Sequence, residues 1–338
     1  MMVDRLQESW LRGSRFLGAR HAILCGAMSW LSEHNLVAAI SAAGGFGVLA
    51  TGNMPPETLQ NEIHQVRKRT SNAFGVNLIT LNPRLGELVT VVVNEKVSHC
   101  VLAGGLPDQE TMRTLKEAGV KVIVFAPSLA IGKRLIRRGA DALIIEGHEA
   151  GGHVGPVATS VLVQEILPHV DEVPVFVAGG IANGDMVANL VAMGAAGCQI
   201  GTRFVCTTEC IAHAKFKDLF IRAQSRDAMV TVQFDPVLPV IPVRALVNKG
   251  TDLFNQMQLR LVSEVKEGRK ERKDAILELE HFWVGALRRA AIDGDVEFGS
   301  VMAGQSVGLV RAIQPVAEVM QELVSVVENR LHASAAVA

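Results

Sequence analysis

Residues 174–204 read PVFVAGGIANGDMVANLVAMGAAGCQIGTRF and contain the unit from which the fold can be predicted. Two short apolar runs, at 174–179 and 197–201, have the length and composition of buried strands. A glycine-rich turn and a helical pattern lie between them. This order of strand, helix and strand predicts a parallel βα unit.

The same alternation covers the chain on the N-terminal side of this unit. Eight apolar runs alternate with amphipathic segments between His21 and about Arg222. Eight βα pairs close a barrel, whereas a doubly wound open sheet needs fewer strands and a reversal of strand order. The sequence therefore predicts an α/β protein with a TIM (β/α)₈ barrel. The other six strands are predicted at residues 22–26, 46–50, 74–79, 100–104, 121–126 and 142–147.

The regular pattern ends after the eighth helix. Pro236, Pro239 and Pro242 make a long strand or helix improbable over residues 230–250. Residues 251–293 then predict two amphipathic helices.

The last part of the chain is too long to be a connector inside a compact barrel. Residues 293–308 predict a glycine-rich loop, 309–331 a closing helix and 332–338 a frayed tail. We therefore expect a C-terminal helical lid insertion over the open end of the barrel. The expected division is a barrel of residues 1–227 with 306–338, and a lid or substrate subdomain of residues 228–305.

The composition excludes several classes of protein. Of the 338 residues 49% are apolar, and the formal net charge is −1, so no global field attracts nucleic acid or an anionic membrane. The five cysteines are scattered and no secretion signal precedes them, which favours a reducing cytoplasm. No uncharged apolar run reaches about 18 residues, so we expect no membrane span. Tyrosine is absent, which excludes a phenol as proton donor.

Two loops have the composition of a phosphate site. Barrel enzymes often bind phosphate with the loops after strands seven and eight, which here are residues 178–185 and 199–204. Gly179, Gly180 and Gly201 would let backbone N–H groups approach phosphate oxygens closely, and the Thr202 hydroxyl adds a donor. The alternative is that both loops are ordinary tight βα turns.

The loop after strand six, EGHEAGGHVG at 146–155, combines glycines with titratable side chains at the catalytic face. His153 is the candidate for proton transfer or hydrogen bonding to a substrate, because an imidazole is tunable near neutral pH. A histidine satisfied by backbone groups is the alternative. We expect His148 and Glu149 to face solvent.

Several motifs do not carry chemistry. GFGVLA at 45–50 fits a dinucleotide fingerprint, but its glycines precede a strand instead of following one. The spacing of His148 and His153 does not fit a zinc helix, and Cys206 with Cys210 lacks a second pair, so we expect no metal. The run KEGRKERK at 266–273 is interpreted as a solvated helix face, with a dock for an acidic carrier protein as the alternative.

As a set, these motifs resemble the superfamily of nitronate monooxygenases and FabK-type FMN-dependent enoyl-ACP reductases. The resemblance covers nearly the whole chain, from ILCGAMSW to GDVEFGSVMAGQSVGLV. It implies a barrel that binds FMN without a covalent bond. His153 matches the active-site histidine. The matching cofactor positions are Asn77, Glu146, Gly151, Gly179, Gly180, Gln199, Ile200, Gly201 and Thr202.

Two departures from the family pattern bear on the site. Family members often read QGGM where this chain reads CGAM, so Gly26 and Ala27 would contact flavin through their backbone. Nitronate monooxygenases tend to have Gln in place of Glu146. The loop GSVMAGQ at 299–305 is closer to the enoyl reductase pattern, and it supplies the substrate and lid candidates Ser300, Met302, Gly304 and Gln305.

The resemblance leaves two reactions open. In the first, NAD(P)H as co-substrate reduces FMN, which passes hydride to an enoyl thioester, with His153 polarising the acceptor. In the second, His153 serves as base or charge partner for an alkyl nitronate and O₂ reoxidises the flavin. A phosphate-binding barrel without turnover is a third hypothesis. Candidate partners are an acyl carrier protein and a second copy of the chain in a homodimer.

Overall fold

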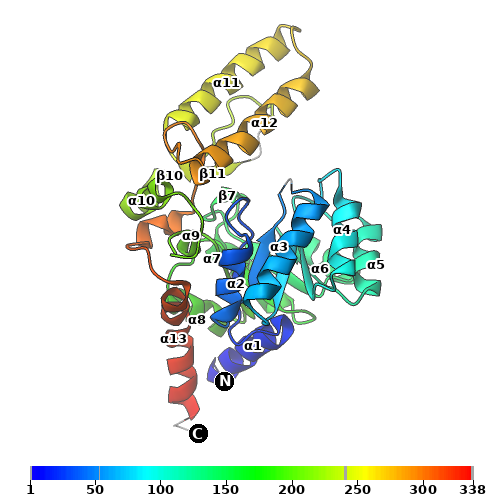
Figure 1. The fold of residues 1–338 in the computed structure, drawn as a ribbon, viewed down its shortest axis with the longest axis vertical. Helices are drawn as coiled ribbons and strands as arrows, with labels where there is room; N and C mark the ends of the chain where they lie inside the picture. The colour runs from blue at the N-terminus through cyan, green and yellow to red at the C-terminus, as the bar shows by residue number, and fades with distance from the viewer. Residues whose placement is uncertain (1, 53, 240–241, 336–338) are drawn as a thin grey trace.

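Eight parallel strands form a barrel at the centre of the structure, a computed structural model that describes residues 2–52, 54–239 and 242–335 (Figure 1). They neighbour one another in the order β1-β9-β8-β6-β5-β4-β3-β2. Cys25 N donates to Phe46 O at 3.0 Å and Phe46 N to Ile23 O at 2.8 Å, which joins β1 to the start of β2. The strands are β1 (Ile23–Cys25), β2 (Gly47–Ala50), β3 (Phe74–Ile79), β4 (His99–Ala103), β5 (Lys121–Phe125), β6 (Ala142–Glu146), β8 (Val175–Ala178) and β9 (Gly197–Ile200).

The predicted TIM barrel is confirmed, and each strand lies within one residue of its predicted bounds. All residues of β2, β8 and β9 are buried, because a parallel barrel strand is covered on both faces. The surrounding helices are α2 (His34–Ala42), α3 (Pro56–Arg69), α4 (Leu85–Asn94), α5 (Gln109–Glu117), α6 (Leu129–Arg137), α7 (Thr159–Ile166), α8 (Gly184–Ala192), α9 (Thr202–Val205) and α10 (Ala214–Arg222).

A helix that the sequence analysis did not assign, α1 (Met2–Leu17), packs at the N-terminal end of the barrel (Figure 1). The carbonyl of Phe16 accepts hydrogen bonds from His99 Nε2 at 2.9 Å and from Lys121 Nζ at 2.8 Å. The Phe16 ring also meets the His99 ring edge-on, with centroids 5.3 Å apart. Since His99 and Lys121 begin β4 and β5, these contacts fix α1 to the base of the barrel.

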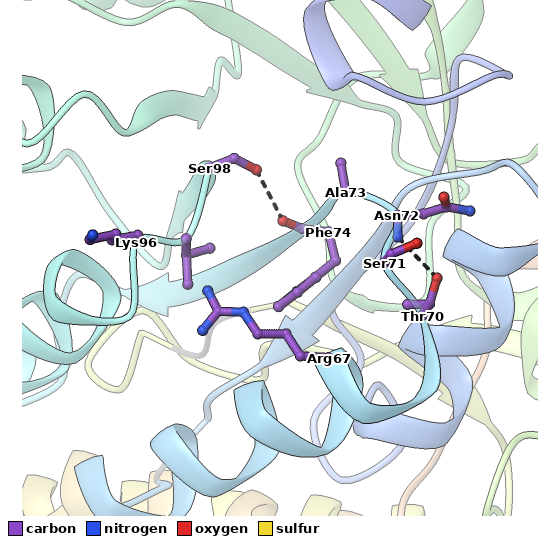
Figure 2. A pocket seen from close by; sticks show the side chains of 9 residues that line it. Arg67, Thr70, Ser71, Asn72, Ala73, Phe74, Lys96 and Ser98 are labelled. Carbon is purple, nitrogen blue, oxygen red and sulfur yellow. Dashed lines mark hydrogen bonds between the residues drawn. The ribbon is translucent and has the colours of Figure 1, made fainter.

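Figure 2 shows a small hollow of about 210 Å³ where α3 and α4 end and β3 and β4 begin. Arg67, Asn72, Lys96 and Ser98 are among its lining residues. It therefore lies at the N-terminal ends of the strands, the face of a barrel that serves stability, whereas active sites lie at the C-terminal ends.

The chain after α10 builds a second, antiparallel sheet around β11. Two of its neighbours are β10 and β12, and the third is β7, which belongs to the loop after β6. This segment is therefore attached at the C-terminal ends of the barrel strands. The four strands are β7 (Gly152–His153), β10 (Ala228–Val230), β11 (Val243–Leu246) and β12 (Val301–Met302).

The two helices predicted within residues 251–293 are present as α11 (Lys249–Lys266) and α12 (Arg272–Ala291). They form a hairpin that projects away from the barrel (Figure 1). Phe254, Leu261 and Leu279 belong to a small apolar core of the hairpin that is separate from the barrel core. The prolines at 236–242 lie between β10 and β11, where no long element forms, as predicted.

The closing helix differs from its prediction at both ends. It begins at Val316 as α13 (Val316–Ala335), because Pro315 has no N–H for an intrahelical bond and suits a helix start. A 3₁₀ turn, η3 (Gln305–Leu309), and irregular chain precede it. Residues 332–335 of the expected frayed tail are helical, and 336–338 lie outside the described residues. No helix in the described part of the chain is long and apolar enough to cross a membrane.

Candidate cofactor and active site

The structure brings several of the predicted cofactor residues together at the C-terminal ends of the strands. Asn77 is buried in β3, and its side-chain Nδ2 donates to Val101 O of β4 at 3.0 Å. Gly26 N donates to Ile200 O at 2.9 Å, and a Cβ added to Gly26 would lie 3.5 Å from the side chain of buried Gln199. The backbone after β1 and the end of β9 therefore form one continuous surface beside Ala27.

The first predicted phosphate loop, after β8, has a backbone conformation that favours glycine. Gly179 and Gly180 have φ angles of 91° and 75°, in the region that favours glycine. A Cβ on Gly179 would lie 2.9 Å from Gly147 O, so no larger residue fits without movement. Among the described residues, the N–H groups of Gly180 and Thr202 donate to no backbone carbonyl outside helices and strands. We take these two N–H groups as candidate donors to a phosphate.

Gly201 joins β9 to α9 and has a negative φ of −116°. A Cβ there would meet Met28 Sδ at 3.5 Å, an ordinary contact. The backbone conformation therefore does not require glycine at this position. The absence of a side chain leaves open space at the end of β9.

Glu146 is the last residue of β6, and burial of its carboxyl group raises the pKa of that group to about 8. Desolvation disfavours the charged form, so the side chain is mostly a neutral acid at pH 7. A neutral carboxylic acid offers one O–H donor and one carbonyl acceptor. It can thus replace the amide of Gln, the residue that the resemblance associates with nitronate monooxygenases.

His148 and Glu149 were expected to face solvent, but they do not. Both are half-buried, and His148 Nδ1 bonds to Gly155 O at 2.7 Å. Glu149 Oε2 accepts from Thr159 N at 2.9 Å and from Thr159 Oγ1 at 3.0 Å. The prediction was wrong because His148 bonds to a backbone carbonyl of the glycine-rich loop and Glu149 accepts from the first residue of α7.

His153 lies in β7, opposite Val243 of β11, and its side chain is exposed. Two residues earlier, a Cβ added to Gly151 would lie only 2.5 Å from Gly304 N. Gln305 N donates to Glu149 O at 2.9 Å. The loop after β6 is thus packed directly against the loop at 299–305.

The four lid candidates do not share one environment. Gly304 N donates to Thr202 Oγ1 at 3.0 Å, so Gly304 lies against the second of the two predicted phosphate loops. Met302 pairs with Ala245 in the second sheet. Ser300 is buried against α12, where its N–H donates to Ala286 O at 2.8 Å, and its hydroxyl finds no hydrogen-bond partner among the described residues.

Sequence reasoning missed Arg244, which is buried in β11 and reaches the loop after β6. Its Nε and Nη2 donate to His148 O at 3.2 and 3.0 Å, and its Nη1 donates to Ala228 O at 2.5 Å. All of these acceptors are backbone carbonyls, so no sequence motif marks the interaction.

Glu33, His34 and Glu62 form a cluster whose potential ligand atoms lie within 4.8 Å of one another. His34 Nδ1 lies 2.9 Å from Glu62 Oε2 and 3.0 Å from Glu33 Oε2. We interpret the cluster as an ion-paired helix start, since Glu33 also accepts from two N–H groups of α2. The expectation of no metal stays a prediction.

The basic run at 266–273 pairs largely with acids of its own hairpin and of the neighbouring loop. Lys266 pairs with Asp235, Arg269 with Glu267, and Lys270 with Glu264 and Glu278. These pairs fit a solvated helix face and leave little free positive charge for an acidic carrier protein.

Comparison with known proteins identifies the family. A family model described as nitronate monooxygenase matches residues 12–89 and 84–325. The chain belongs to the nitronate monooxygenase family. It is an FMN-dependent oxidoreductase, as its relatives in this superfamily are, which sets aside a binding protein without turnover.

Several members of the superfamily align over most of their length. The structure of FabK from Thermotoga maritima is 36% identical, covers 97% of this chain and 99% of its own, and has a TM-score of 0.84. A Rhodococcus jostii relative, named as an octahydro-1H-indene-4-carboxyl-CoA dehydrogenase, is 28% identical over 95% of this chain and 96% of its own. A probable nitronate monooxygenase from Staphylococcus aureus is 28% identical over 83% of this chain and 92% of its own.

Proposed function

We propose that this enzyme uses FMN and NAD(P)H to reduce the conjugated double bond of an enoyl thioester. The observation that carries the proposal is the docking of the loop at 299–305 on the candidate site. Gly304 of that loop contacts both Thr202 and Gly151, and the motif GSVMAGQ is the feature that resembles enoyl reductases. The 36% identity with FabK over 97% of the chain supports the same reaction.

The phosphate of FMN would be held by the loops after β8 and β9. Gly201 leaves room for it, the positive φ angles of Gly179 and Gly180 shape the loop after β8, and the N–H groups of Gly180 and Thr202 are candidate donors. The flavin ring would lie against the backbone of Gly26 and Ala27 and near Asn77, Glu146, Gly151, Gln199 and Ile200. Bound FMN supplies the hydride-transfer chemistry that the side chains lack.

His153 is the residue we assign to the thioester. Its imidazole would donate a hydrogen bond to the thioester carbonyl oxygen and stabilise the negative charge that develops there during reduction. The chain has no tyrosine that could take this role. Glu146, as a neutral acid, would donate one hydrogen bond at the flavin without placing a negative charge beside it.

We further propose that residues 228–305 act as the lid and substrate subdomain. The pairing of β11 with β7 puts this segment next to His153. Ser300, Met302, Gly304 and Gln305 are its candidate substrate contacts. The relative from Rhodococcus jostii carries a carboxyl-CoA in its name, which favours a CoA thioester, and the paired charges at 266–273 do not favour a carrier-protein dock there.

Nitronate oxidation is the second candidate, because the family model carries that description. The same site would bind the anionic nitronate, with His153 as base or charge partner and no need for a nicotinamide.

Anaerobic stopped-flow absorbance at the flavin band separates the two reactions. The purified protein is mixed in turn with NADH, NADPH and propionate 3-nitronate. We expect rapid bleaching by a nicotinamide and recovery of the colour on addition of crotonyl-CoA. Bleaching by the nitronate alone would make the enzyme a nitronate monooxygenase, and a protein that retains no FMN would overturn the cofactor assignment.

A further inference from the structure

Arg244 is a buried cation that, within the described part of the chain, makes no hydrogen bond to a carboxylate. Only 3% of its surface is exposed, although a buried charge is costly unless every donor finds a partner. The guanidinium bonds of Arg244 go to the backbone carbonyls of His148 and Ala228. Burial lowers its pKa, and the nearby charge of Glu149 raises it, so the carboxylate partly offsets the desolvation.

The same residue is tied to the loop after β6 at two points. Its backbone lies opposite Gly152 in the ladder between β11 and β7, and Val243 lies opposite His153. Its side chain reaches back to His148 O, at the other end of the same short loop. One residue of the lid segment therefore holds both ends of residues 148–152.

We infer that Arg244 is a positioning residue that fixes the loop at 148–152 and thereby the place of His153 at the site. The loop needs such a device because it contains Gly151 and Gly152, the latter with a φ of 76°, and glycines give a loop many alternative conformations. A guanidinium presents its N–H groups in a rigid fork, which a flexible ammonium cannot reproduce. The inference rests on the proposed role of His153.

The bond to Ala228 offers a simpler explanation of the burial of Arg244, in which the side chain only connects β10 to the loop after β6 and so contributes to stability. The two explanations differ in what a substitution changes. Loss of a purely stabilising contact lowers stability without a special relation to His153. Substitution of a positioning residue no longer affects turnover once the imidazole is removed.

The test compares wild-type enzyme with Arg244→Lys, His153→Ala and the double variant, each loaded with FMN. The first measurement is hydrogen exchange in the peptide that contains residues 148–153. We expect faster exchange in Arg244→Lys, and no change in Arg260→Lys, a matched variant of an exposed arginine in α11. An unchanged exchange rate in Arg244→Lys would overturn the inference, independently of the role of His153 in turnover.

The second measurement is kcat and KM for reduction of crotonyl-CoA by NADH or NADPH. Arg244→Lys should lower kcat by about 10- to 100-fold in the wild-type background, the effect of a displaced catalytic group. In the His153→Ala background it should lower kcat by less than about 3-fold, since the two residues act as a unit. Equal losses in both backgrounds would overturn the inference.

An unaltered kcat in His153→Ala would instead remove the proposed role of His153. The exchange data would then still decide whether Arg244 orders the loop. Should Arg244→Lys not fold, Arg244→Gln enters the same comparisons, because it removes the buried charge and keeps an N–H donor toward His148 O.

Discussion

The hydroxyl of Thr202 accepts a hydrogen bond from the backbone N–H of Gly304 at 3.0 Å. The two residues are 102 positions apart and belong to the loop after β9 and the loop at 299–305. Because the hydroxyl accepts this bond, its own hydrogen remains free to point toward a phosphate oxygen. One side chain thus connects the proposed phosphate loop with the loop that resembles enoyl reductases.

Thr202→Ala should weaken FMN binding by about 10-fold, because it removes a phosphate donor and leaves Gly304 N–H without its acceptor. Titration of the flavin-free protein with FMN, followed by quenching of flavin fluorescence, measures the change in Kd. Thr202→Ser keeps the hydroxyl and should bind FMN like the wild type. An unchanged Kd in Thr202→Ala would remove this residue from the site.

Gly201→Val should fold but lose its flavin. An added Cβ meets only Met28 within 4 Å, so the fold tolerates it, while the branched side chain occupies the space that the phosphate needs. Absorbance of the purified protein at the flavin band measures retention. Gly86→Val, in α4 where nothing lies within 4 Å, is the control and should stay yellow. A stable Gly201→Val protein that retains its full complement of FMN would contradict the assignment of this loop to the phosphate.

The barrel could be predicted from sequence because buried parallel strands are continuous apolar runs that end at glycine or polar residues. The run at 142–147, for example, became β6 over Ala142–Glu146. The late start of α13 also had a signal in Pro315, which suits a helix start better than a helix interior. The barrel thus follows from local patterns. The second sheet of β7, β10, β11 and β12 was not predicted, because its strands are only two to four residues long and pair across distant segments.

The site was less predictable, because its contacts join distant segments. Gly179 and Gly180 of the loop after β8 could be found, since their positive φ angles restrict the residue type. Arg244 could not, because its partners are backbone carbonyls of residues 148 and 228, which have no side-chain signature. The place of Glu149 was predicted wrongly because its donors, the N–H and hydroxyl of Thr159, lie ten residues further along the chain at the start of α7.

Glu146 should make the fold less stable as pH rises. Its pKa is raised from 4.5 to about 8, so between these values the folded chain keeps a proton that the unfolded chain releases. The free energy of unfolding should then fall by up to about 1.4 kcal/mol per pH unit from this group. Urea unfolding of the flavin-free protein from pH 5 to 8 measures the slope. Glu146→Gln should lack this component, and parallel curves for the two proteins would refute the prediction.

His99 should produce the opposite slope at lower pH. Burial is the main cause that lowers its pKa from 6.5 to about 4, and the charge of Lys121 adds to the effect. Below pH 6.5 His99 is therefore protonated in the unfolded chain but still neutral in the folded chain. The free energy of unfolding decreases as the pH falls toward 4. The wild type should lose up to about 1.4 kcal/mol per pH unit from this group over that window.

His99→Gln is the variant that checks this assignment, because its amide can still donate to Phe16 O while it cannot titrate. Its free energy of unfolding should be lower than that of the wild type at pH 7, and the difference should shrink as the pH approaches 4. His64→Gln, a change in a more exposed histidine of α3 that bonds to Glu95, serves as the control. If the wild type and His99→Gln lose stability in parallel between pH 6.5 and 4, another group is responsible for the acid sensitivity.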